Sequence, residues 1–178
     1  KLPKELTGAE VIVMREDVDR LLQMRPGGKE QPIDRIVDDG DKVQLGDATL
    51  TAHRTAGHTK GCTSWSLEVE ENGETYLALI VGSFGVNPGY VLADNPDYPA
   101  IADDYRATFA KARALPVDVF LGSHGFWYDM ERKLERAMSR SEGEPNPFID
   151  RPGYLAHIDQ QEQRFLEMLS EQEQETQR

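Results

Sequence analysis

Two histidines of the chain have the residue type and the surroundings of a metal ligand. His58 lies in a short loop between two strand-like runs, with Gly57 before it, and His124 follows another strand-like run and precedes Gly125. A neutral imidazole is a common zinc ligand, and small neighbouring residues leave room for a metal and a substrate. Because loops at the ends of strands in one sheet converge on a common rim, we expect His58 and His124 to meet there.

The remaining polar candidates are expected to be less important for catalysis. His53 falls inside a predicted strand and His157 on a helix that the sequence predicts to be exposed, so both are expected to be structural. A nucleophile at Ser83 or Ser123 is the rival chemistry, but neither lies in the Gly-x-Ser-x-Gly turn of serine hydrolases. Cys62 is a weaker candidate still, since a lone cysteine is usually a small core residue.

The elements that must position these residues alternate between strands and helices, which predicts an α/β (α+β) fold. The clearest local signal is Asn72-Gly73, which predicts a tight hairpin turn. Strands are expected at 10–14, 33–37, 64–70, 75–81 and 117–121, a further hairpin at 43–54, and helices at 17–24, 101–115, 128–140 and 153–170. The loop at 84–99 is too long for a simple connection, which indicates a binding role. Residues 1–178 are expected to form one domain, with a frayed tail at 171–178.

Composition excludes several classes of partner. The chain has 178 residues, a formal net charge of -12 and no cluster of Lys and Arg, which argues against nucleic acid and against an anionic membrane surface. No apolar run approaches the ~20 residues that span a bilayer. Its one cysteine cannot form an internal disulfide. Because the chain begins with Lys1 rather than Met, we expect it to start after a processing point or a cut, and the lack of a signal peptide is uninformative.

Four ordered blocks resemble the class B metallo-β-lactamases of subclass 3. They lie at 51–65, which includes Ala56-Gly57-His58-Thr59, and at 81–90, 94–105 and 118–125, and the likeness continues through 147–150. The resemblance implies part of an αββα sandwich with two zinc ions at one edge. It also implies a periplasmic or secreted enzyme that hydrolyses the β-lactam ring of antibiotics, with a small-molecule β-lactam as its partner.

Site residues follow from the resemblance position by position. His58 is similar to a ligand of the first zinc and His124 to a ligand of the second, and Ser83 and Ser123 are implied to bind substrate. Ser83 stands where relatives such as glyoxalase II and lactonases have a metal-bridging Asp, and because a hydroxyl is a poor zinc ligand, this favours a lactamase. Gly85 stands where some members carry another substrate-binding hydroxyl.

The family's His-x-His-x-Asp-His motif does not occur in this sequence. By the resemblance, the motif lies just upstream of the segment that the first residues match, so we expect the chain to be the C-terminal two thirds of such an enzyme. With two of the usual six zinc ligands, the chain alone is expected to be inactive. Two alternatives stay open: a non-catalytic assembly module that binds itself or a missing N-terminal part, and a related zinc hydrolase acting on lactones or thioesters.

Overall fold

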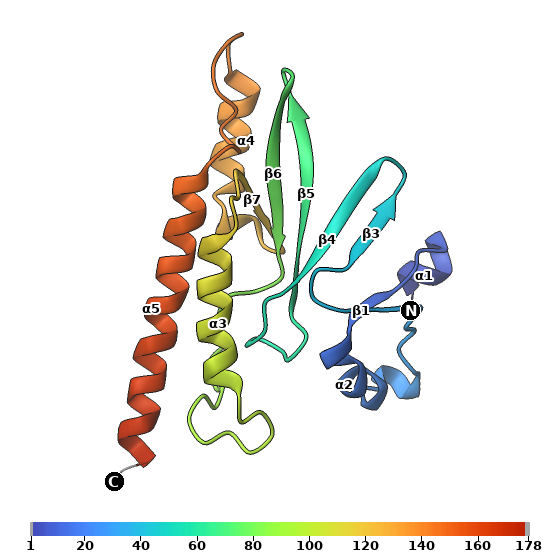
Figure 1. Ribbon diagram of the computed structural model, residues 1–178, viewed down its shortest axis with the longest axis vertical. Coiled ribbons are helices and arrows are strands. Elements are labelled where there is room, and N and C mark those ends of the chain that lie inside the picture. Colours follow the sequence, from blue (N-terminus) through green and yellow to red (C-terminus); the bar gives the residue numbers. More distant parts are fainter. Residues whose placement is uncertain (1, 177–178) are drawn as a thin grey trace.

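A five-stranded sheet organises the chain and brings four strand ends to one edge. The computed structural model describes residues 2–176, and the sheet has the order β3 (Lys42–Leu45), β4 (Ala48–Arg54), β5 (Thr63–Glu71), β6 (Glu74–Val81), β7 (Val119–Gly122). Neighbours are antiparallel except for β6 and β7, which are parallel, with Val81 opposite Gly122. The carboxyl ends of β4, β6 and β7 and the amino end of β5 therefore share one edge (Figure 1).

The predicted hairpin at Asn72-Gly73 is confirmed. Both residues have positive φ, 54° for Asn72 and 82° for Gly73, as a two-residue turn between twisted strands requires. The turn fixes the register of β5 and β6, with Trp65 opposite Ile80.

Two long helices cover one face of the sheet. α3 (Ile101–Ala114) connects the parallel strands β6 and β7, and α5 (Arg151–Thr176) lies beside α3 along the same side of the sheet (Figure 1). Phe109 and Phe165 meet between these helices with ring centroids 5.7 Å apart, and Leu79 and Phe120 from the sheet are buried in the same core. This core holds β6 and β7, the strands that lead into the loops of Ser83 and His124.

The N-terminal segment forms a smaller layer against the opposite face. It contains α1 (Leu2–Thr7), β1 (Ile12–Met14), the 3-10 turn η1 (Arg15–Asp17), α2 (Val18–Gln23), η2 (Pro26–Gly28) and β2 (Arg35–Val37). β1 and β2 pair in parallel, and Met14 and Val37 pack with Ala52 and Trp65 of the main sheet. This small core joins the N-terminal segment to β4 and β5.

The predicted α/β class is confirmed as a sheet packed against helices, and the structure differs from the sequence analysis in four details. The strand expected at 117–121 is β7 at 119–122, and the expected helix 128–140 is η3 (Gly125–Trp127) followed by α4 (Met130–Ser139). α5 continues to Thr176, into the tail expected to be frayed; residues 177–178 of that tail lie outside the described part. His157, expected to be exposed, is buried at 7% exposure. None of the described helices is both long and apolar enough to cross a membrane.

Candidate metal and substrate site

The loop that carries His58 depends on a glycine at position 57. Gly57 has φ 131°, which side chains rarely allow, and a Cβ there would lie 2.7 Å from atoms of the Tyr105 ring. The Tyr105 hydroxyl donates a hydrogen bond of 3.0 Å to the carbonyl oxygen of Gly85. Tyr105 therefore lies against the His58 loop and also holds the segment that follows β6.

A carboxylate from the N-terminal segment fixes the other side of this loop. Asp17 accepts a hydrogen bond of 2.6 Å from the Thr59 hydroxyl and one of 2.8 Å from the main-chain N–H of Gly61. The Arg54 guanidinium donates to the carbonyl of Lys60 at 2.8 Å and pairs with Asp104 of α3 at 3.1 Å. These bonds define the path of residues 59–61, directly after the candidate ligand.

The His58 imidazole is half-buried, and one of its nitrogens has a main-chain neighbour. Its Nδ1 lies 3.3 Å from the carbonyl oxygen of Gly85, and the Tyr90 hydroxyl donates to the His58 carbonyl at 3.0 Å. The rings of His58 and Tyr90 are 5.7 Å apart. If Nδ1 carries the proton that faces Gly85, then Nε2 is left as the lone-pair nitrogen, which is the arrangement typical of a metal-binding histidine.

The segment Gly82–Gly85, at the end of β6, contacts both predicted site loops. Ser83 is 7% exposed, and its Oγ accepts a hydrogen bond of 3.3 Å from the N–H of Gly85. Ser123, at the end of β7, donates from its hydroxyl to the carbonyl of Gly82 at 3.4 Å. His58 touches the segment at Gly85 and Ser123 touches it at Gly82, so the segment links the two loops.

His124 lies on the β7 side of this edge and is exposed. Its ring stacks on Phe126 at 5.3 Å and meets the edge of Trp127 at 4.9 Å. Trp127 lies so close to Gly122 that a Cβ there would be 2.7 Å from the indole. Small residues before His124 therefore let the aromatic pair pack beside it.

The four predicted site residues, His58, Ser83, Ser123 and His124, all lie on loops at one end of the sheet. The close approach of His58 and His124 stays a prediction. His53 is elsewhere, inside β4, where its Nε2 is 2.7 Å from Ser66 Oγ; burial lowers its pKa. Cys62 is buried, and burial raises the pKa of its thiol, which is unlike a reactive nucleophile.

Three further residues shape the site and were not among the predicted site residues. Asp17 bonds Thr59, which is 42 positions away, and Tyr90 bonds His58, which is 32 positions away. Tyr105 lies against Gly57, which is 48 positions away, and also bonds Gly85 beside the loop. Only Tyr90 had a signal, because it lies in the long loop predicted to have a binding role. The contacts of Asp17 and Tyr105 depend on tertiary packing that local patterns do not encode.

The described residues do not make a complete metal site. Among them, no group of three or more His, Cys, Asp and Glu side chains could hold a metal ion. Zinc needs at least three protein ligands in catalytic sites, so the imidazoles of His58 and His124 are too few on their own.

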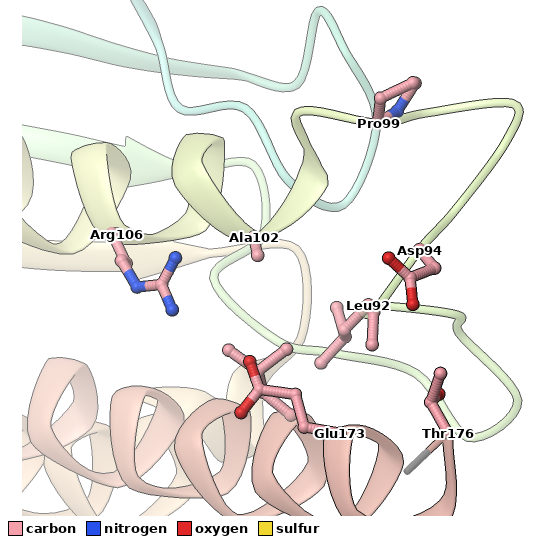
Figure 2. Close-up of a pocket in the computed structure, with 9 residues that line it drawn as sticks. Leu92, Asp94, Pro99, Ala102, Arg106, Glu173 and Thr176 are labelled. Atoms are coloured by element: carbon pink, nitrogen blue, oxygen red, sulfur yellow. The ribbon is translucent and has the colours of Figure 1, made fainter.

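A cavity of about 350 Å³ lies away from the predicted ligands. It is open between the loop at 92–99, α3 and the end of α5, where Asp94, Arg106 and Glu173 border it (Figure 2). None of the four predicted site residues lines it. The cavity is therefore separate from the site at the sheet edge.

Comparison with solved structures identifies the fold. The chain is similar to FEZ-1 metallo-β-lactamase from Legionella gormanii, with 38% identity and a TM-score of 0.88, over 97% of this chain and 69% of FEZ-1. It is similar to BJP-1, a subclass B3 enzyme of Bradyrhizobium japonicum, with 37% identity and a TM-score of 0.85, over 97% of this chain and 67% of BJP-1. LRA-12 from an Alaskan soil metagenome, a class B3 di-zinc enzyme, matches at 26% identity and a TM-score of 0.78, over 93% of this chain and 66% of its own.

No protein-family model matches the sequence. The architecture is nevertheless that of a metallo-β-lactamase fold. It has a sheet with helices on one face and the histidine loops at one end of the strands. The chain belongs to the class B3 metallo-β-lactamases. It spans about two thirds of the length of these relatives.

Proposed function

We propose that this chain takes part in zinc-dependent hydrolysis of the β-lactam ring, with His58 and His124 as zinc ligands. The observation that carries the proposal is the Gly82–Gly85 segment, which touches His58 on one side and Ser123 on the other. Ligand and substrate-binding residues thus lie along one continuous edge. The activity in the names of FEZ-1 and BJP-1 supports the choice of reaction.

The chain's own residues have binding and orienting roles in this proposal. Gly85 and Tyr90 orient the His58 loop through its imidazole and its carbonyl, and Ser83 and Ser123, which bond to Gly85 and Gly82, are the proposed substrate-binding residues. Two imidazoles do not hold catalytic zinc by themselves, so we assign no hydrolytic step to this chain alone. The further ligands would come from a His-x-His-x-Asp-His segment, which this sequence does not contain.

Substrate class and location follow the family in this proposal. A β-lactam is favoured over a lactone or thioester because Ser83 stands where a metal-bridging Asp would be expected for those substrates. The proposed location is the periplasm or the exterior of the cell, as the family resemblance implies.

Two forms of the protein test the proposal. One is the chain of 178 residues, called the printed chain below. The other is an extended enzyme, in which a segment carrying the family motif precedes Lys1. The extended enzyme is expected to bind zinc and hydrolyse nitrocefin, whereas the printed chain is expected to do neither. Hydrolysis of an acyl-homoserine lactone by the extended enzyme, without turnover of any β-lactam, would replace the lactam with a lactone as the substrate.

A second candidate role, self-association, is favoured by one surface of the sheet. On the face opposite α3 and α5, Ile80 is 39% exposed, and Leu67 and Leu121 are only partly buried. Exposed apolar sheet faces commonly bind partners. Sedimentation of the printed chain checks this role: a dimer supports it, and a compact monomer at high concentration counts against it.

A further inference from the structure

The cavity between the loop at 92–99, α3 and the end of α5 has an apolar floor. Leu92 and Leu169, which line it, are only 3% and 5% exposed, and Ala102 of α3 lines it as well. Its volume of about 350 Å³ is within the range of ~300–1,000 Å³ that is typical of pockets for small molecules. Since none of the four predicted site residues lines this cavity, its ligand would be distinct from the proposed β-lactam substrate.

Hydrogen bonds to Gln172 fix the loop that forms one wall of the cavity. The Oε1 of Gln172 accepts from the N–H groups of Leu92 at 2.7 Å and Ala93 at 3.2 Å. Its Nε2 donates to the carbonyl of Tyr90 at 2.7 Å. The Oδ1 of Asn95 accepts from two main-chain N–H groups further along the same loop, at 3.0 and 2.9 Å. The wall is therefore formed without a ligand, which lowers the entropy cost of binding one.

Two carboxylates at the rim of the cavity have no counter-charge. Asp94 from the loop and Glu173 from α5 border the opening (Figure 2), and within the described part of the chain neither carboxylate forms an ion pair or a hydrogen bond. The cation of the rim, Arg106, already has partners. It donates to Asp103 at 3.0 Å, and its guanidinium lies 5.8 Å from the centre of the Phe165 ring. The rim therefore has an excess of negative charge that its own residues do not balance.

A carboxylate rim over an apolar floor selects an organic cation. A metal ion does not fit, because no group of three or more His, Cys, Asp and Glu side chains among the described residues could hold one. An ammonium group has three N–H donors for carboxylate oxygens, and hydrogen bonds between charged groups are stronger than neutral ones. An alkyl chain on the ammonium group gains free energy by burial against leucine side chains. A ligand with both parts matches both features of the cavity.

We propose that this cavity binds an alkylammonium ion, with the ammonium group between Asp94 and Glu173 and the alkyl chain against Leu92 and Leu169. The two parts of the ligand meet different elements, because Asp94 and Leu92 belong to the loop whereas Glu173 and Leu169 belong to α5. The site goes beyond the proposed function, since neither zinc nor a β-lactam takes part in it.

Three ligands with the same chain and different head groups test the site on the printed chain: hexylammonium, 1-hexanol and hexanoate. The main-chain amide signals of Leu92 and Ala93 are followed by ¹H–¹⁵N NMR during each titration. Hexylammonium is expected to shift them with a Kd on the order of 1 mM, and the other two are expected to bind at least about tenfold more weakly. Propylammonium, with three fewer CH₂ groups, is also expected to bind at least about tenfold more weakly than hexylammonium. No shift with hexylammonium, or equal binding of hexanol or propylammonium, would overturn the proposal.

Variants locate the binding within the molecule. Glu173→Gln and Asp94→Asn are each expected to weaken hexylammonium about threefold to fivefold, as the loss of one exposed charge pair predicts. Ala102→Leu, which fills the floor of the cavity, is expected to abolish the shifts. Glu171→Gln removes the same charge from the same helix but not from this cavity, so it is the control and is expected to leave the Kd unchanged. If Glu171→Gln weakens binding as much as Glu173→Gln does, or if Ala102→Leu still binds, the ligand does not occupy this cavity.

Discussion

Asp17 and Thr59, which are 42 positions apart, are joined by a hydrogen bond of 2.6 Å from the Thr59 hydroxyl to Asp17 Oδ2. The other carboxylate oxygen accepts from the N–H of Gly61 at 2.8 Å. One side chain of the N-terminal layer therefore holds both ends of the turn that follows His58. The histidine loop is positioned by tertiary contacts as well as by the strands on either side.

Asp17→Asn is expected to loosen this turn. The amide keeps one acceptor but presents an NH₂ group to one of two donors, and a lost hydrogen bond to a charged group costs ~1.5–3 kcal/mol. Urea denaturation of the printed chain measures the fall in the free energy of unfolding. Asp19→Asn, at an exposed position of α2, is the control and is expected to stay within ~0.5 kcal/mol of the original. An Asp17→Asn variant as stable as this control would show that the turn does not need the carboxylate.

Gly57→Ala is expected to destabilise the protein more than Gly89→Ala. Both glycines have positive φ, 131° and 85°, but a Cβ at Gly57 meets the Tyr105 ring whereas one at Gly89 meets open space. The backbone cost is ~1 kcal/mol at Gly89 and larger at Gly57, whose φ lies further from the left-handed region, and the overlap with Tyr105 adds ~1–3 kcal/mol at Gly57 alone. Thermal unfolding of the two variants gives the difference, and equal losses would mean that Tyr105 moves aside without cost.

Local sequence signals predicted the parts of the fold that depend on neighbouring residues. The Asn72-Gly73 turn and the loops of His58 and His124 at strand ends are examples. His157 shows why the rest was missed. It lies on the buried stripe of α5 with Tyr154, Ile158, Gln161 and Phe165, but Asp159 and Gln160 around it made that stretch look solvated. A buried polar residue on an amphipathic helix breaks the binary pattern, so the pattern alone gives the wrong exposure.

His157 is expected to make stability depend on pH between about 4 and 6.5. Burial lowers its pKa to about 4 in the folded protein, and an unfolded histidine has a pKa of ~6.5. Between these values the unfolded chain binds a proton that the folded chain does not, so the free energy of unfolding falls as the pH falls, by roughly 2–3 kcal/mol in all.

His157→Phe removes this titration and keeps a ring beside Phe120, which lies 4.9 Å from the His157 ring. Denaturation curves of the variant from pH 7 to pH 4 are expected to be flatter than those of the original chain. Gln160→Leu changes no titrating group and is expected to keep the original slope. A slope in His157→Phe equal to that of the original chain would mean that other groups cause the acid sensitivity.

The ion pair of Lys133 and Asp150 is expected to hold α4 against the start of α5. Lys133 is 4% exposed, its Nζ lies 2.8 Å from Asp150, and Asp150 also accepts from the N–H of Gly153 at 2.9 Å. Burial raises the pKa of Asp150, but the hydrogen bonds from Lys133 and Gly153 outweigh it and lower the pKa overall.

Lys133→Met leaves that carboxylate without its cation. The expected loss is near or below the ~3 kcal/mol lower bound for buried pairs, because the Asp150 side chain is still 32% exposed. Chemical denaturation measures it, with Arg136→Met as the control, since Arg136 is an exposed cation of the same helix that forms no ion pair within residues 2–176. If Lys133→Met and Arg136→Met lose equal stability, the ion pair of Lys133 and Asp150 contributes no more than an exposed cation of the same helix does.

The two histidines at the sheet edge give the most direct test of the zinc proposal. Their imidazole nitrogens are expected to lie within roughly 4 to 7 Å of each other in the zinc-bound extended enzyme, from metal–nitrogen bonds of ~2.0–2.1 Å and a two-metal spacing of ~3.5 Å. His58→Ala and His124→Ala are each expected to remove one tightly bound zinc from the pair and to reduce nitrocefin turnover at least ~100-fold. His53→Ala is the control, because His53 bonds Ser66 inside β4 and is expected to keep both zinc ions. Metal analysis after dialysis measures the stoichiometry. Full zinc content in His58→Ala or His124→Ala would remove that histidine from the ligand set. A separation above ~12 Å between the two imidazoles in a zinc-bound crystal structure would show that they do not bind one metal pair.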